Sequence, residues 1–194
     1  MRKRTGILGG TFDPPHIGHL IIADQVLHQL RLDEIRFMPN HIPPHKEIKS
    51  DSAPEDRLKM LQLAVEGNKY FKIETIELKR KGTSYTYDTM VQLKKAEPDT
   101  EFFFIIGGDM IDDLPNWHKI DELVKLVKFV GVDRPFYKGK TDYPVHMIDI
   151  PLIHVSSTMI RKKIAAGQSV KYLLPDPVIT FIEENHLYGA RKST

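Results

Sequence analysis

The stretch that decides the fold lies at residues 5–19 and reads TGILGGTFDPPHIGH. It opens with a short run of the length of a buried strand, which ends at two consecutive glycines. A helical pattern then runs from Ile17 to about Gln29, with apolar residues on one stripe at Leu20, Ala23, Val26, Leu27 and Leu30. A strand that passes through a glycine turn into a helix is the first half of a strand–helix–strand unit.

The same alternation continues along the chain. Further strands are predicted at residues 35–38, 71–76, 101–106, 128–132 and 145–148. Further helices are predicted from Pro54 onward and at residues 86–95, 158–166 and 176–185. Such alternation is typical of a mostly parallel sheet with helices on both faces. We therefore predict an α/β, Rossmann-like fold, a single domain over residues 1–194 with small C-terminal helices at about 156–188.

The composition is that of an ordinary globular protein, with 41% hydrophobic and 28% charged residues. Because 28 basic residues nearly balance 26 acidic ones, the net charge of +2 favours no general attraction to nucleic acid or membranes. The lack of cysteine excludes disulfides and thiolate metal sites. No apolar run approaches the roughly 20 residues of a membrane helix, and no signal-peptide pattern is present. We expect a cytoplasmic protein with no nucleic-acid or membrane partner.

Four segments with unusual residues follow predicted strands, at 9–19, 40–46, 107–118 and 154–161. Right-handed crossovers place the loops that follow parallel strands along one edge of the sheet. Ligands of such sheets bind in the crevice beyond the carboxyl ends of the strands. The sequence therefore predicts one site, built from these four segments.

The first segment has the properties of a phosphate site. Gly9 and Gly10 let the backbone approach a ligand closely with its amides pointing outward, although neither a G-x-G-x-x-G nor a Walker A pattern is present. His16 and His19 lie three residues apart at the head of a helix, so both rings can share one face. Gly18 between them leaves room for a nucleotide, and the helix N-terminus favours phosphate. The alternatives are two surface histidines, or a metal pair that needs a third ligand.

The last segment, residues 154–161, reads HVSSTMIR. Three consecutive hydroxyl residues at a helix start can cap the helix and present donors to an anion. Arg161 can project over the same helix end and offer forked donors to phosphate oxygens. The alternative is an ordinary serine cap with a solvated arginine.

The string GGTFDPPHIGH at residues 9–19 resembles the signature of the nucleotidyltransferase superfamily that includes class I aminoacyl-tRNA synthetases. It is very close to that of bacterial nicotinate-nucleotide adenylyltransferases. The segment at 154–161 resembles the second signature of that superfamily, which holds the β- and γ-phosphates of ATP. The resemblance covers residues 5–188 and implies adenylyl transfer from ATP to nicotinate mononucleotide, giving deamido-NAD and pyrophosphate. It also implies Mg²⁺ carried by ATP rather than by side chains, and it makes a homodimer plausible.

The resemblance assigns roles to individual residues. It implies catalytic roles for His16, His19 and Arg161. The residues implied to bind ATP are Gly9, Gly10, Thr11, Phe12, Gly18, Gly107, Asp109, Ser156, Ser157 and Thr158. The residues implied to bind the nicotinate nucleotide are Lys46, Ser84, Tyr85, Thr86, Gly108, Trp117, His118 and Arg134. Thr86 and Trp117 are expected at the nicotinate ring, and Lys46 near a substrate phosphate.

For some of these residues the sequence also allows an interpretation that does not depend on the resemblance. Trp117 lies in a loop and is suited to stack on a pyridinium ring, or it is a packing residue. Asp109 can accept a hydrogen bond from a ribose hydroxyl or cap the next helix, and Ser84 or Thr86 can cap the helix at 86–95. His118 stands where close relatives are expected to carry tyrosine.

Two other functions fit the phosphate segments. One is adenylyl or cytidylyl transfer to another phosphate, such as phosphopantetheine, against which the Trp117 loop and the GTSYT segment at 82–86 argue. The other is a nucleotide-sensing module without turnover, against which the presence of both phosphate segments argues.

Overall fold

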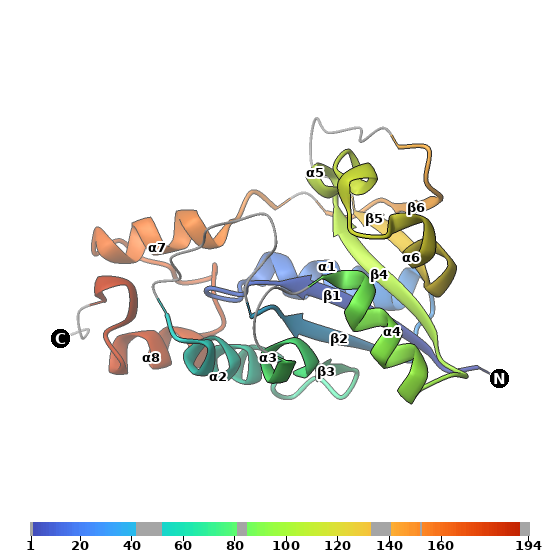
Figure 1. Ribbon diagram of the computed structural model, residues 1–194. Helices are drawn as coiled ribbons and strands as arrows, with labels where there is room; N and C mark the ends of the chain where they lie inside the picture. The colour runs from blue at the N-terminus through green and yellow to red at the C-terminus, as the bar shows by residue number, and fades with distance from the viewer. Residues whose placement is uncertain (1, 42–51, 81–84, 133–140, 152, 191–194) are drawn as a thin grey trace.

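In the computed structural model, the described residues are 2–41, 52–80, 85–132, 141–151 and 153–190 (Figure 1). Within them, one sheet contains six strands in the order β3-β2-β1-β4-β5-β6, and every neighbouring pair is parallel. The strands are β1 (Arg4–Gly10), β2 (Glu34–Pro39), β3 (Phe71–Ile73), β4 (Glu101–Gly107), β5 (Val127–Val132) and β6 (Val145–Ile148). This doubly wound order confirms the predicted Rossmann-like fold, and the direction of winding changes between β1 and β4.

Helices cover both faces of the sheet. They are α1 (Ile17–Gln29), α2 (Pro54–Val65), α3 (Ile76–Arg80), α4 (Thr86–Ala96), α5 (Gly108–Ile111), α6 (Ile120–Leu126), α7 (Ser157–Ala165) and α8 (Asp176–Glu184). Two 3₁₀ turns complete the described elements, η1 (Leu114–Asn116) and η2 (Leu187–Gly189). None of the helices in the described ranges is long and apolar enough to cross a membrane.

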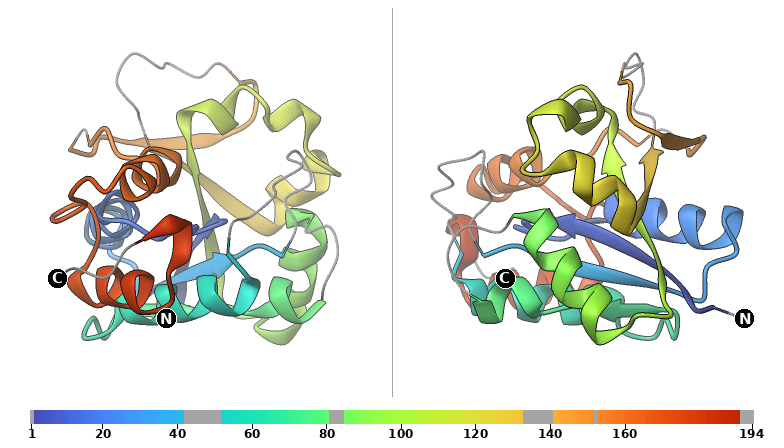
Figure 2. Two further views of the ribbon diagram at one scale, coloured as in Figure 1. Left: turned by 90° about the vertical axis from the view of Figure 1, so that its left-hand side faces the viewer. Right: turned by 45° about the vertical axis from the view of Figure 1, so that its right-hand side comes forward.

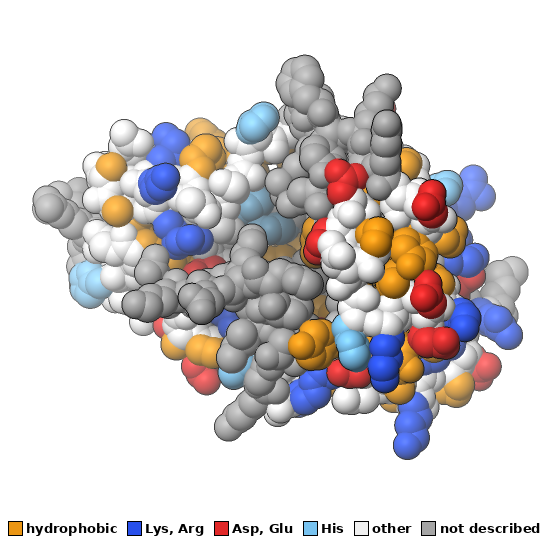
Figure 3. Space-filling view, turned by 45° about the horizontal axis from the view of Figure 1, so that its top comes forward, with side chains coloured by type: hydrophobic (Ala, Val, Ile, Leu, Met, Phe, Trp, Pro, Cys, Tyr) orange, Lys and Arg blue, Asp and Glu red, His pale blue; other side chains and the backbone are white. Residues whose placement is uncertain are grey.

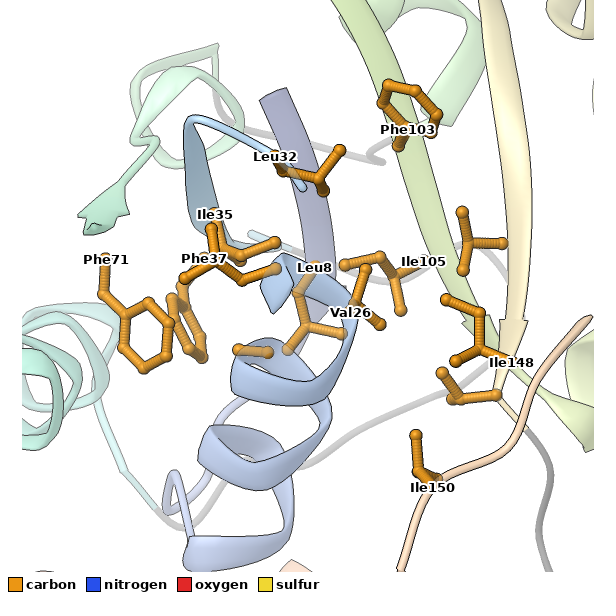
Figure 4. Close-up of a cluster of buried hydrophobic side chains, with 14 of the residues drawn as sticks. Leu8, Val26, Leu32, Ile35, Phe37, Phe71, Phe103, Ile105, Ile148 and Ile150 are labelled. Atoms are coloured by element: carbon orange, nitrogen blue, oxygen red, sulfur yellow. The ribbon is translucent and has the colours of Figure 1, made fainter. Parts of the chain in front are cut away.

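The core follows from the alternation of side chains along buried strands. In β4 the residues from Phe102 to Ile106 are all buried, as expected for a parallel strand covered on both faces. Phe103 and Ile105 pack with Val26 of α1 on one face (Figure 4). Phe102, Phe104 and Ile106 pack on the opposite face with residues of α4 and α6. The strand β4 thus contributes side chains to the apolar clusters on both faces of the sheet.

The predicted C-terminal helices are present as a separate layer at one end of the sheet. Residues of α2, α7 and α8 share a third apolar cluster around Met60, Ile160 and Val178. Figure 2 shows α7 near α1 and α8 beside α2. The Ile17 amide at the start of α1 also donates to the carbonyl of Leu173, 3.1 Å away. The C-terminal layer is therefore attached to the helix that follows β1.

Three local predictions were wrong. The strand predicted at 71–76 ends at Ile73, because the Glu74 carboxylate accepts from the Ile76 amide at 3.1 Å and starts α3. The stretch 114–118, predicted as a loop, begins with the 3₁₀ turn η1, and α5 precedes it. The helix α6 was not predicted, because its seven residues are too few for a clear helical period.

Candidate active site

The two histidines after β1 form one stacked unit. His16 is the N-cap residue of α1, and its backbone amide donates to His19 Nδ1 at 3.1 Å. The two rings stack with centroids 3.7 Å apart and an interplanar angle of 25°. Because Nδ1 accepts, the neutral His19 ring carries its proton on Nε2. The structure therefore confirms that the two rings lie on one face of α1. It also leaves His19 Nε2 as the ring nitrogen that can donate a hydrogen bond to a ligand.

The backbone of Gly18 lies against the His16 ring. A Cβ at this position would lie 3.0 Å from His16 Nδ1 and 3.1 Å from His16 Cε1. The absence of a side chain at Gly18 therefore lets the His16 ring pack closely on the first turn of α1.

The side chain of Phe12 faces the core rather than a ligand. It is buried, in the apolar cluster with Phe37, and its φ of 52° lies in the left-handed region. A Cβ at Gly10 would lie 3.1 Å from the Phe12 ring. Phe12 was predicted to bind ATP, but its buried ring can only anchor the turn, so its backbone alone is available to a ligand.

The second phosphate segment meets this turn. Arg161 Nη1 donates to the Asp13 carbonyl at 2.8 Å, and Ser157 Oγ donates to the Pro14 carbonyl at 2.9 Å. The stretches near residues 16 and 158 therefore converge, as the predicted single site requires. Ser156 Oγ accepts from the Met159 amide at 3.2 Å and caps α7, the predicted alternative use of this hydroxyl.

The surface over α7 is basic. Lys162 and Lys163 follow Arg161 on this helix, and its first turn holds no acidic residue. Figure 3 shows lysine and arginine side chains over this part of the molecule. The exposed Thr158 lies at the same helix end. The first turn of α7 thus places no carboxylate against an anion, and the two lysines add positive charge at its last turn.

A buried arginine that was not predicted as a site residue binds the backbone of the turn after β1. Arg57 of α2 is 2% exposed, and its Nη1 donates to the carbonyls of Thr11 (2.8 Å) and Asn40 (2.9 Å). Burial lowers the pKa of Arg57, and the nearby Asp13 carboxylate opposes this shift. The guanidinium thus joins the loops after β1 and β2. The available signal was its place one turn before Leu61 on the apolar stripe of α2.

The predicted nicotinate residues come from two segments. His118 lies beside Tyr85, with ring centroids 4.7 Å apart, so the loop after η1 meets the start of α4. The half-buried Trp117 packs edge-on against Phe104 (6.0 Å) and Phe129 (5.9 Å). The indole is therefore a packing residue, and it lies next to His118 in the segment predicted to bind the nicotinate nucleotide.

The other predicted residues are placed as follows. Gly9, Gly107 and Gly108 lie at the carboxyl ends of β1 and β4, and Thr86 begins α4. Lys46, Ser84, Arg134 and the side chain of Asp109 lie outside the described residues. In the part of the chain that the structure describes, no group of three or more His, Asp or Glu residues is arranged to hold a metal ion.

Comparison with known proteins supports one family. Residues 7–163 match the model described as cytidylyltransferase-like. The chain is 56% identical over 190 residues to a Geobacillus thermodenitrificans protein named "Probable nicotinate-nucleotide adenylyltransferase", covering 98% of this chain and 88% of the relative. A Lactiplantibacillus plantarum protein of the same name is 56% identical over 186 residues, covering 96% and 88%.

Among solved structures, Plasmodium falciparum nicotinic acid mononucleotide adenylyltransferase complexed with NaAD superposes with a TM-score of 0.80. The alignment covers 98% of this chain and 100% of that chain, at 22% identity. At this identity the likeness concerns the fold.

Proposed function

The chain belongs to the cytidylyltransferase-like family, and we propose that its site at the carboxyl ends of β1 and β4 transfers the adenylyl group of ATP to nicotinate mononucleotide. The protein is a nucleotidyltransferase, and the products are deamido-NAD and pyrophosphate, a step of NAD biosynthesis. The observation that carries the proposal is the contact of Arg161 and Ser157 with the carbonyls of Asp13 and Pro14. It unites the two phosphate segments at one edge of the sheet.

The reaction needs positioning more than a base. An oxygen of the nicotinate mononucleotide phosphate attacks the α-phosphorus of ATP, and the bond from that phosphorus to the bridging oxygen of the β-phosphate breaks. The electron pair of that bond leaves with pyrophosphate. Because the attacking phosphate is already an anion at neutral pH, no proton has to be removed to create the nucleophile. The barrier lies in bringing two polyanions together and stabilising the charge that develops.

The residues of the turn supply this stabilisation. His19, the less buried histidine, offers Nε2–H to a phosphate oxygen, and His16 supports it by stacking. Arg161, held at Asp13, binds the β- and γ-phosphates. The proposed ATP contacts are the backbones of Gly9, Gly10, Thr11, Phe12 and Gly18, the sheet edge at Gly107 and Asp109, and the start of α7 at Ser156, Ser157 and Thr158.

The nicotinate nucleotide would bind on the other side of the site. Trp117 and His118 form one wall with Tyr85, and packing against β4 and β5 orients the indole before a ligand arrives. An aromatic ring held in this way can stack on an electron-poor pyridinium. Thr86, Gly108 and the residues outside the described ranges, Lys46, Ser84 and Arg134, complete the proposed contacts.

A divalent cation, which we take as Mg²⁺, would arrive on the ATP phosphates. His19 and Arg161 present hydrogen-bond donors, which suit the phosphate oxygens that would carry the ion. When bound, the ion neutralises phosphate charge.

Three further points belong to the proposal. A cytoplasmic location fits a chain without cysteine whose substrate is ATP. The single domain over residues 1–194 is supported by the shared cluster that joins the C-terminal helices to α2. A homodimer is proposed from the family alone, and light scattering after size exclusion tests it.

The experiment that tests the function is a pyrophosphate-release assay with ATP, Mg²⁺ and separate acceptors. We expect release with nicotinate mononucleotide, with deamido-NAD as the second product. Nicotinamide mononucleotide in parallel measures the preference for the ring substituent. Release with phosphopantetheine and none with a pyridine nucleotide would reassign the acceptor. Binding of ATP without release for any acceptor would support the sensing module instead.

A further inference from the structure

A tyrosine near the C-terminus reaches into the turn after β1. The hydroxyl of Tyr188, in η2, donates to Asp13 Oδ1 at 2.5 Å, across 175 positions of sequence. Ser52 Oγ donates to the same carboxylate oxygen and lies 3.4 Å from the Tyr188 hydroxyl. The Asp13 side chain is 3% exposed. Two hydroxyls that lie far apart in the sequence therefore hold one buried carboxylate.

The surroundings of this cluster favour a protonated Tyr188 hydroxyl. A buried carboxylate requires donors and a counter-charge, and the Arg57 guanidinium provides the positive charge. Burial, together with the hydrogen bond to Asp13, raises the pKa of Tyr188 above its ordinary value. The hydroxyl thus keeps its proton and acts as a donor throughout the neutral range.

Asp13 also holds Arg161, the residue proposed to bind the phosphates of ATP. Its side chain accepts from Tyr188 and Ser52, and its backbone carbonyl accepts from Arg161. His16 follows three positions later as the cap of α1. Asp13 thus links the C-terminal turn, through its carboxylate, to Arg161, through its carbonyl.

The backbone around the tyrosine is shaped for this contact. His186, Tyr188 and Gly189 all have φ in the left-handed region, at 51°, 56° and 76°. This region is unfavourable for histidine and tyrosine, so tertiary contacts must compensate. The contacts that the structure offers are the Asp13 hydrogen bond and the C-terminal apolar cluster, in which Tyr188 also packs.

We propose that Tyr188 is a positioning residue for adenylyl transfer, whose hydroxyl acts through Asp13 to hold Arg161 and the turn before α1 in the arrangement that binds ATP. The proposal rests on the proposed function. The C-terminal turn is then part of the ATP site, although it contacts no reacting atom.

The test is Tyr188→Phe, which removes only the hydroxyl. We expect the KM for ATP, and the Kd for ATP measured by calorimetry, to rise about tenfold, the range for a lost hydrogen bond to a charged group. The KM for nicotinate mononucleotide should stay within about twofold, because that side of the site does not depend on Asp13. In an Asp13→Ala background, which has no acceptor for the tyrosine, Tyr188→Phe should change the ATP values by less than about twofold, since the two residues act as one unit.

Two control variants separate positioning from loosening of the C-terminal layer. Tyr172→Phe removes a hydroxyl from a tyrosine that is 79% exposed and should change nothing. Val178→Ala opens a cavity in the C-terminal cluster, where Val178 is 0% exposed, and should lower Tm without raising the KM for ATP. If Tyr188→Phe fails to fold, Ser52→Ala removes the other donor to Asp13 and replaces it in the comparison.

The proposal is overturned if Tyr188→Phe leaves ATP binding unchanged, if Val178→Ala weakens ATP binding to the same extent, or if the effect of Tyr188→Phe persists in the Asp13→Ala background. Failure of the proposed function would look different. The unaltered protein would then release no pyrophosphate with nicotinate mononucleotide, while calorimetry with ATP would still decide the role of Tyr188.

Discussion

Replacing His19 by asparagine or by alanine separates its two roles. The Nδ1 atom accepts from the His16 amide at 3.1 Å, the return hydrogen bond of a helix cap. The Nε2 atom carries the proton proposed to meet a phosphate. Asparagine can place an acceptor near the position of Nδ1 but has no counterpart of Nε2, whereas alanine has neither.

The magnitudes follow from these contacts. Alanine loses the cap hydrogen bond, worth about 1 kcal/mol, and the ring contacts with His16 and Phe12, worth about 0.5–1 kcal/mol. His19→Ala should therefore lower the free energy of unfolding by about 2 kcal/mol, and His19→Asn by about 0.5 kcal/mol. Both should lower kcat by roughly two to three powers of ten, the usual loss of one transition-state donor.

Urea unfolding measures the change in the free energy of unfolding, and pyrophosphate release measures the change in kcat. His28→Asn is the matched control, because His28 lies on the same helix with a side chain that is 67% exposed. It should change neither value. A kcat for His19→Asn close to that of the unaltered protein would refute the role of Nε2, and an equal loss of stability in both His19 variants would refute the cap.

Three more predictions concern other parts of the molecule. Arg161→Ala should raise the KM for ATP by about tenfold or more, measured by initial rates, and unchanged ATP parameters would remove its role. Trp117→Ala should weaken nicotinate mononucleotide more than ATP in the same assay and lower stability by about 2–3 kcal/mol because the indole packs on two phenylalanines; equal effects on both substrates would contradict the stacking. Arg36, hydrogen-bonded to both Glu97 oxygens, holds the pKa of Glu97 below its usual 4.5. This stabilisation is complete above about pH 4.5 and is lost as the pH falls through the lowered pKa. Glu97→Gln should therefore cost about 1 kcal/mol in urea unfolding at about pH 7 and less at about pH 3, and an equal cost at both values would contradict the ion pair.

Much of the fold could be predicted because the periodic spacing of apolar residues indicates helices and strands locally. The helix at 17–29 was predicted with the bounds that the structure has, and β4 was evident from five consecutive apolar residues. Once strands and helices alternate, the handedness of their connections places the loops at one edge. The convergence of the segments near residues 16 and 158 followed from this rule and from the resemblance of both segments to one superfamily.

The errors arose where neighbours along the chain do not decide the outcome. The strand predicted to run to residue 76 stops at 73 because Glu74 starts a helix instead. The burial of the Phe12 ring could not be predicted either, because it depends on Phe37, which lies 25 positions away. The close packing of the His16 ring on Gly18 also became evident only in the structure.

The alternation of the main strands and helices, the sheet edge expected to carry the site and the histidine pair were thus determined by the sequence alone, because hydrophobic period and helix caps act over a few residues. Only the tertiary structure decided that Arg57 ties two loops together and that Tyr188 holds Asp13. Those hydrogen bonds join residues between 17 and 175 positions apart. A polar side chain that is buried by such distant partners looks, in the sequence, like any solvated one.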